Sequence, residues 1–120
     1  MYCVSRAEVR HTDRTSAHEA IRIAREELLH LMIMDVRMPD LPGIDAYRTI
    51  RRFKRCLPCI FLSEDMGRRT RVAAMSESAY TLVRKPVDTG FLHSVVEELL
   101  LKRYANGPSM PPSEQPGAPQ

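Results

Sequence analysis

Three residues of this sequence could together carry phosphoryl chemistry: Asp35, Ser63 and Lys85, each at the end of a short apolar segment. A carboxylate can attack phosphorus as a nucleophile, and phosphoryl transfer then depends mainly on positioning and charge neutralisation. The ammonium of Lys85 could hold one phosphoryl oxygen, and the hydroxyl of Ser63 could donate a hydrogen bond to another. A divalent cation would offset the remaining negative charge. Spacing alone leaves a structural alternative open, in which Asp35 caps a helix or forms an ion pair with Lys85.

The segments that must position these residues alternate between strand-like and helix-like patterns. Strands are predicted at 8–12, 31–34, 59–62 and 81–83. Helices are predicted from Ser16, which begins an S-x-x-E capping box, and at 44–53, 68–78 and 89–104, the last capped by Asp88. This alternation favours a parallel α/β sheet, whose ligands bind at the carboxyl ends of the strands. We therefore expect the acid, the hydroxyl and the amine to meet at that edge.

Length and composition are those of one small globular domain. The chain has 120 residues, a net charge of +3 and three cysteines. An odd cysteine count argues against a secreted disulfide scaffold, and no apolar run approaches the roughly 20 residues of a membrane helix. Because the sequence also lacks a signal-peptide pattern, we expect a cytoplasmic protein with no membrane partner. The basic clusters at 48–55 and 68–71 lack a nucleic-acid reader motif, so we interpret them as solvated helix faces.

The composition changes near the carboxyl end. Residues 106–120 are rich in Pro, Gly and Ser and contain almost nothing to bury. We predict a folded domain at 1–105 and a disordered Pro-rich tail at 106–120.

Cys56-Leu57-Pro58-Cys59 forms a C-x-x-C motif, which can mark redox chemistry. Redox motifs of this kind open a helix, where the helix terminus lowers the pKa of a thiol. Here the motif precedes an apolar strand, so we assign it no redox or metal function.

Three motifs resemble those of bacterial response-regulator receiver domains. Residues 31–39, with Gly43 after them, are similar to the phosphoacceptor segment of that family: an apolar strand, then Asp-x-x-Met-Pro and a glycine. Residues 60–63 resemble its fourth strand with a terminal Ser or Thr. Residues 83–86 resemble its fifth strand with a Lys-Pro pair. The resemblance runs from about residue 9 to residue 101, with the motifs in the family's order.

The resemblance implies a role for each site residue. Asp35 would take a phosphoryl group from a phosphohistidine of a sensor histidine kinase or a phosphotransfer protein. Lys85 would contact that group, and Ser63 would move toward it and report the change to the face formed by the family's fourth helix and fifth strand. The backbone carbonyl of Arg37 and the carboxylate of Asp35 would bind Mg2+, and Pro86 would carry a cis peptide bond.

The match is incomplete at the amino-terminal end. The family begins with a strand that ends in two acids, which help to bind magnesium, and then a first helix; the segment before Glu8 contains no acid. We therefore expect a flavodoxin-like doubly wound parallel sheet, N-terminally truncated, in which 1–6 is at most the end of the first helix. The third strand would then have an open edge, and the second could be lost, pair with the third directly, or be replaced by a partner's strand.

Two smaller departures concern the site and the signalling face. Glu64 directly follows Ser63, where the family usually has a small residue. It could replace a metal ligand, although a solvated acid is the favoured interpretation. Leu82 stands where the family often has an aromatic switch residue, and Tyr80 is two positions away. Switching by an aromatic rotamer is therefore not expected.

Three classes of function are compatible with these observations. The leading hypothesis is a stand-alone response regulator receiver of a two-component phosphorelay. It would be a phosphoprotein rather than an enzyme, with an upstream kinase and a downstream protein partner. The second is a pseudo-receiver that binds proteins and is never phosphorylated. The third, ranked low because no second acid or base is apparent, is a small hydrolase that uses the same aspartate. The sequence does not decide whether the chain forms a homodimer, and nucleic acid is not an expected partner.

Overall fold

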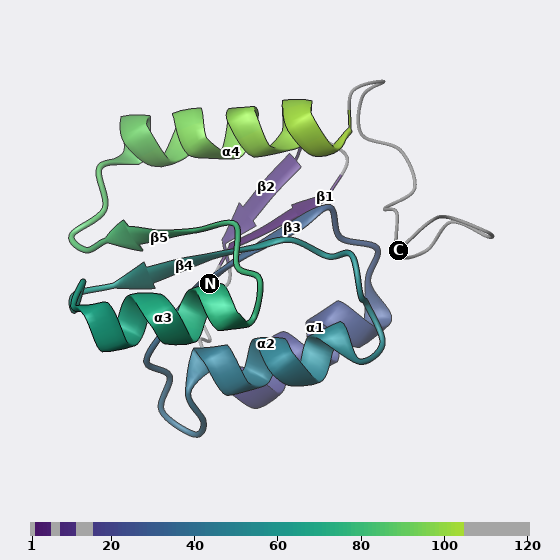
Figure 1. Ribbon diagram of the computed structural model, residues 1–120. Coiled ribbons are helices and arrows are strands. Elements are labelled where there is room, and N and C mark those ends of the chain that lie inside the picture. Colours follow the sequence, from purple (N-terminus) through teal and green to yellow (C-terminus); the bar gives the residue numbers. More distant parts are fainter. Residues whose placement is uncertain (1, 6–7, 12–15, 105–120) are drawn as a thin grey trace.

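The computed structural model describes residues 2–5, 8–11 and 16–104 of the chain, so the predicted tail at 106–120 lies outside the described residues. The elements are β1 (Tyr2–Ser5), β2 (Glu8–His11), α1 (Ala17–Glu26), β3 (Leu31–Asp35), α2 (Gly43–Arg51), β4 (Cys59–Ser63), α3 (Arg68–Ser76), β5 (Thr81–Arg84) and α4 (Thr89–Arg103). The strands form one sheet in the order β2-β1-β3-β4-β5. Figure 1 shows α4 on one face of this sheet and α1, α2 and α3 on the other.

The parallel half of the sheet consists of β3, β4 and β5, and it confirms the predicted strands at 31–34, 59–62 and 81–83. Successive side chains of a strand point to opposite faces, so a strand covered by helices on both faces must be apolar throughout. Accordingly, Met32 and Phe61 are buried in the cluster under α1, α2 and α3, whereas Ile33 and Ile60 are buried in the cluster under α4.

The predicted helix starts at Ser16 and Asp88 are confirmed. Ser16 Oγ accepts a hydrogen bond from the N–H of Glu19 at 3.1 Å, and Asp88 Oδ1 accepts one from the N–H of Phe91 at 3.1 Å. Each cap satisfies a backbone donor that has no partner inside its helix. Among the described residues, no helix is both long and apolar enough to span a bilayer.

The amino-terminal segment differs from the prediction. Residues 2–5 form a strand, so their assignment to the end of a helix was wrong. β1 is antiparallel to both β2 and β3, and the N–H of His30 donates to the carbonyl of Val4 at 2.7 Å. A short link can join antiparallel neighbours, whereas parallel neighbours need a crossover of a dozen or more residues.

Two further expectations about the sheet change as a result. The sheet is mixed rather than wholly parallel, and β3 has a paired edge rather than an open one. β2, predicted at 8–12, is present but pairs with β1 instead of β3. Val4 is fully buried and packs in the cluster under α4, which explains why this strand remains on the sheet. The proposed truncation stays a prediction.

Candidate functional site

The carboxyl ends of β3, β4 and β5 lie together at one end of the strands, here called the site rim. Backbone bonds continue the ladder there: the N–H of Val36 donates to the carbonyl of Leu62 at 2.9 Å, and that of Lys85 to the carbonyl of Ser63 at 2.9 Å. These bonds bring Asp35, Ser63 and Lys85 to one cavity of about 290 Å3. The cavity is lined by Asp35, Arg37, Leu62, Ser63, Glu64, Asp65 and Lys85.

Asp35 and Lys85 form an ion pair across this cavity. Lys85 Nζ lies 2.9 Å from Asp35 Oδ1, and the carboxylate raises the pKa of the lysine above its usual value. The Asp35 side chain is 22% exposed, so solvent can still reach it. Its Oδ1 atom is nevertheless buried and, among the described residues, has no hydrogen bond of good geometry besides this ion pair. The carboxylate is therefore held at the end of its strand with spare capacity to accept a donor or a cation.

Ser63 lines the same cavity, but its hydroxyl points elsewhere. Ser63 Oγ donates to the carbonyl of Asp65 at 2.8 Å and accepts from the N–H of Asp65 at 3.1 Å. The Ser63 residue is buried, and both bonds close a local turn. A contact between this hydroxyl and a group on Asp35 would require the side chain to rotate out of the turn.

The loop between β3 and α2 carries Arg37 into the lining of the cavity. Its base is closed by the N–H of Gly43, which donates to the carbonyl of Val36 at 2.8 Å. A Cβ atom on Gly43 would lie 2.0 Å from the carbonyl oxygen of Asp35, so only glycine fits. On the other side of the cavity, the peptide bond between Lys85 and Pro86 is cis.

A residue that the sequence analysis missed, Asp40, joins this loop to α1. Asp40 Oδ1 accepts from the N–H of Ala17 at 2.8 Å, and Oδ2 accepts from the N–H of His18 at 3.0 Å. These bonds hold the pKa of the Asp40 carboxyl well below its usual range. The start of α1 held a signal for such a residue. Ser16 satisfies the N–H of Glu19, so the N–H groups of Ala17 and His18 need an acceptor from another segment.

The cavity offers few ligands for a cation. The Asp65 carboxylate is occupied, since it accepts from the N–H of Gly67 at 2.8 Å and from Thr70 Oγ1 at 2.9 Å. Glu64 is exposed. Within 2–5, 8–11 and 16–104, no group of three or more His, Cys, Asp or Glu side chains is arranged to hold a metal ion. Asp35, with its buried oxygen, fits a Mg2+ ion that keeps most of its water or takes phosphoryl oxygens as ligands.

A surface cavity lies beside β5, the strand that the predicted signalling face would include. A cavity of about 270 Å3 is lined by Arg71, Met75, Thr81 and Leu82. Leu82 is half-buried, and the hydroxyl of Tyr80 donates to Glu98 Oε1 on α4 at 3.1 Å. Tyr80 is thus engaged with α4, away from the residues of the site cavity.

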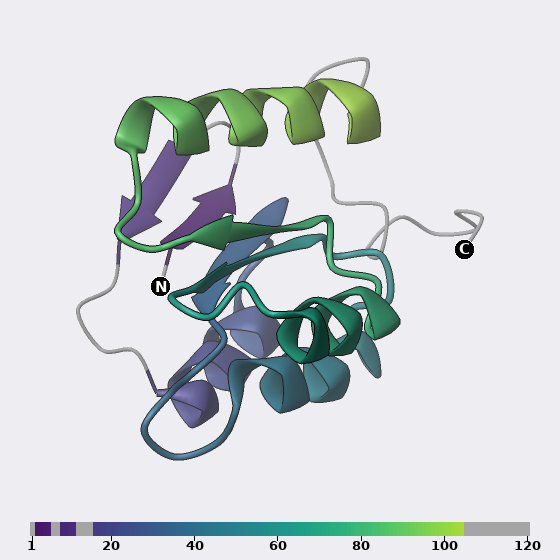
Figure 2. The same cartoon turned by 60° about the vertical axis from the view of Figure 1, so that its left-hand side comes forward.

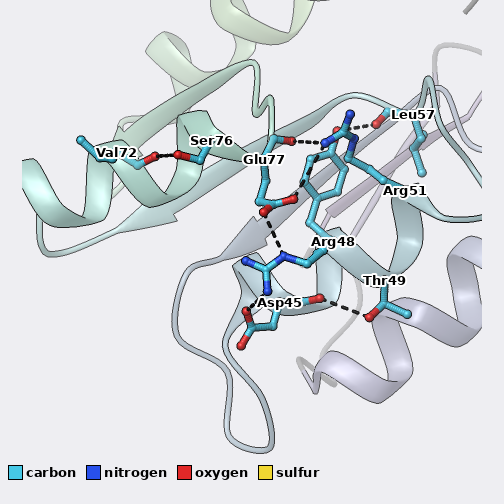
Figure 3. A network of polar contacts seen from close by, with 9 residues as sticks. Asp45, Arg48, Thr49, Arg51, Leu57, Val72, Ser76 and Glu77 are labelled. Carbon is cyan, nitrogen blue, oxygen red and sulfur yellow. Dashed lines mark hydrogen bonds and ion pairs between the residues drawn. The ribbon is translucent and has the colours of Figure 1, made fainter.

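The carboxyl end of α3 is attached to α2 by a polar network, which Figure 3 shows from close by. Arg48 Nε donates to Glu77 Oε2 at 2.9 Å, and Arg51 donates to the carbonyl of Glu77 at 3.0 Å. The hydroxyl of Tyr47, also on α2, donates to the carbonyl of Leu57 at 2.7 Å. The helix α3, which lines the cavity beside β5 with Arg71 and Met75, is therefore anchored to α2 at its carboxyl end.

The C-x-x-C motif lies away from the site. Cys59 is a buried thiol, and burial raises its pKa well above its usual value. A protonated, buried thiol is a poor nucleophile, so the motif adds nothing to the chemistry of the rim.

Comparisons with known proteins agree with this geometry. The sequence profile described as "Response regulator receiver domain" matches residues 4–97. The chain is similar to the transcriptional regulatory protein ZraR of Salmonella typhimurium, with 27% identity over 96 residues, which are 80% of this chain and 22% of that protein. It is also similar to the response regulator SaeR of Staphylococcus aureus, with 28% identity over 99 residues, which are 81% of this chain and 43% of that protein. The chain thus spans less than half the length of these curated relatives.

A solved structure gives the same answer at the level of the fold. The crystal structure of a two-component response regulator of the LuxR family from Aurantimonas superposes with a TM-score of 0.66 and 28% identity, covering 81% of this chain and 66% of that one. Since the family profile matches most of the sequence, the chain belongs to the response regulator receiver domain family, whose members are two-component signalling modules rather than enzymes.

Proposed function

We propose that this chain accepts a phosphoryl group on Asp35 and that the modification changes its affinity for a downstream protein partner. Receiver domains partner with histidine kinases, and we propose a sensor kinase or a phosphotransfer protein as the donor, in the cytoplasm. The observation that carries the proposal is the contact between Lys85 Nζ and Asp35 Oδ1 in a cavity that Ser63 also lines. A nucleophile, a fixed cation and a hydroxyl donor are the parts that phosphoryl transfer needs.

The proposed step transfers a phosphoryl group and changes no oxidation state, so it needs no oxidant or reductant. A carboxylate oxygen of Asp35 attacks the phosphorus of a phosphohistidine, and a P–O bond forms as the P–N bond breaks. The departing imidazole nitrogen keeps the electron pair and takes a proton from water. Lys85 neutralises part of the charge on the transferred group, and the hydroxyl of Ser63 rotates out of its turn to donate to a phosphoryl oxygen.

Receiver domains typically bind Mg2+, and a bound Mg2+ would neutralise the phosphoryl oxygens during transfer. In this chain the carboxylate of Asp35 and the carbonyl of Arg37 would be its protein ligands. Among the described residues, β1 (Tyr2–Ser5) contains no acid, and because it is antiparallel to β3 its start rather than its end lies near the site, with Tyr2 beside Ile33. We therefore expect weak Mg2+ binding and slow phosphorylation.

The test is incubation of the chain with acetyl phosphate and Mg2+, followed by intact mass. We expect one phosphoryl adduct on the wild-type chain and none on Asp35→Asn, which removes the nucleophilic oxygen. The control is Glu97→Gln, which changes an exposed carboxylate on α4 and should leave the adduct unchanged. An adduct that persists in Asp35→Asn would overturn the assignment of the acceptor.

The alternative function is a pseudo-receiver that binds its partner without phosphorylation. The observation that favours it is the engaged state of the site, where Lys85 covers the carboxylate and the hydroxyl of Ser63 is bonded within its own turn. This alternative predicts that a folded wild-type sample gains no mass with excess acetyl phosphate and Mg2+. It also predicts that Asp35→Asn leaves partner affinity unchanged.

A further inference from the structure

The loop that follows the phosphoacceptor strand is fixed at two points. Its base is closed by the bond from Gly43 to Val36, and its tip is bonded through Asp40 to the first turn of α1, which is 22 to 23 residues away in sequence. Figure 2 shows the loop descending from the sheet to the start of α1. Between these two points lies Arg37, which lines the site cavity.

The tip contact is a strong one for an exposed loop. Both carboxylate oxygens of Asp40 accept backbone N–H groups of α1, and Oδ2 also contacts the ring nitrogen Nδ1 of His18. A carboxylate at a helix start is favoured twice, by the unpaired donors and by the helix dipole. Asp40 therefore does for α1 what a capping residue does, but from a different element of the fold.

We propose that Asp40 is a positioning residue for phosphorylation of Asp35, because it holds the loop that carries Arg37 against the site cavity. The inference rests on the proposed function and deepens it, because a contact with α1, outside the site, would then set the position of the loop. Without the tip contact, the bond from Gly43 to Val36 still closes the base of the loop, but the Arg37 backbone is held less firmly next to Asp35.

The chain offers a matched control for this proposal. Ser16 and Asp40 both satisfy donors in the first turn of α1, but the side-chain hydrogen bond of Ser16 stays within its own helix, whereas those of Asp40 come from the loop. Ser16→Ala and Asp40→Ala should lower the melting temperature by similar amounts, since each removes a cap. Only Asp40→Ala should release the loop, which separates positioning from helix stability.

The first measurement is amide hydrogen exchange at Gly43, whose N–H closes the base of the loop. We expect Asp40→Ala to speed this exchange about fivefold, the factor to which a cap of about 1 kcal/mol corresponds, and Ser16→Ala to leave it unchanged. Asp40→Asn should give an intermediate value, because its single amide oxygen can accept only part of the bonds. Equal exchange at Gly43 in Asp40→Ala and Ser16→Ala would overturn the proposal.

The second measurement is the rate of adduct formation with acetyl phosphate as a function of Mg2+ concentration. We expect Asp40→Ala to need about fivefold more Mg2+ for its half-maximal rate, the same factor as for exchange, with Ser16→Ala like wild type. An unchanged Mg2+ dependence in Asp40→Ala would contradict the positioning role. A wild-type chain that forms no adduct would instead refute the proposed function, and the exchange comparison would still decide whether Asp40 holds the loop.

Discussion

The two halves of the sheet are built on different principles. β3, β4 and β5 are parallel and covered by helices on both faces, so they depend on continuous apolar runs. β1 and β2 form an antiparallel hairpin, which joins the sheet by backbone pairing of β1 to β3 and by burial of Cys3 and Val4. The first half brings together the residues of the site, whereas the second protects the edge that those strands would otherwise expose.

The largest expected effect lies in the parallel half. Phe61 of β4 is fully buried and packs edge-to-face on Tyr47 of α2, with ring centroids 5.8 Å apart. Phe61→Ala should lower the free energy of unfolding by about 4 kcal/mol, since it removes a large side chain and leaves a cavity. Urea denaturation followed by circular dichroism measures this change. A loss below about 1 kcal/mol would mean that β4 is not central to the core.

A second variant tests the close approach of α2 to the site rim, which occurs at Gly43. Gly43→Ala would place a methyl group on the carbonyl of Asp35, and the resulting backbone shift should cost about 3 kcal/mol. Gly90→Ala is the control, because a Cβ there lies 3.4 Å from the nearest atom, Asp88 Oδ1, and the helix should gain about 1 kcal/mol. Thermal melts of the two variants should therefore move in opposite directions. A shared direction would refute the close approach at Gly43.

The hairpin is tested by Val4→Ala. Val4 is fully buried under α4, so the loss of its two methyl groups should cost about 2 kcal/mol in urea denaturation. Leu101→Ala, at a position 73% exposed, should change stability by less than about 0.5 kcal/mol. If Val4→Ala behaved like Leu101→Ala, β1 would not be packed on the sheet as described.

The smallest effect concerns the junction of the two halves. The hydroxyl of Tyr104 donates to the carbonyl of His30 at 2.9 Å, and the N–H of His30 in turn donates to Val4 of β1. Tyr104→Phe should cost about 1 kcal/mol at neutral pH through the lost hydrogen bond. An unchanged free energy of unfolding in urea denaturation would mean that water already competes for the carbonyl of His30.

The same residue gives a dependence on pH. Burial raises the pKa of Tyr104 to about 12, while in the unfolded chain the pKa of tyrosine is about 10. The stabilising contribution is complete below pH 10 and is lost as pH rises toward 12, because the unfolded chain releases the proton first. Urea midpoints across this window should fall less steeply in Tyr104→Phe than in wild type. The decline should persist in part, because burial also raises the pKa of Tyr47. Equal slopes would contradict the pKa assignment.

The features predicted correctly depend on local pattern or on topology. Apolar runs identified β3, β4 and β5, and the parallel order of these strands was enough to place Asp35, Ser63 and Lys85 at one cavity. The caps at Ser16 and Asp88 follow from contacts within four residues, so the sequence pattern is sufficient for them.

The features that were missed depend on contacts between distant segments. β1 has only four residues, and its pairing with β3 becomes favourable only once β3 has a free edge. Asp40 is an ordinary loop acid until α1 is placed beside it. The orientation of the Ser63 hydroxyl depends on the turn at Asp65, which no motif describes. In each case the feature depends on a contact with a distant segment or on the rotation of a side chain, and the local sequence pattern shows neither.

The antiparallel direction of β1 has a practical consequence for protein engineering. Tyr2 is paired with Ile33, two residues before Asp35, so β1 begins on the side of the sheet where β3, β4 and β5 end. The end of α4 lies at the opposite side, where Tyr104 contacts His30 just before β3. An affinity tag or fluorescent protein fused before Tyr2 would lie near Asp35, whereas one fused after α4 would leave the site cavity clear.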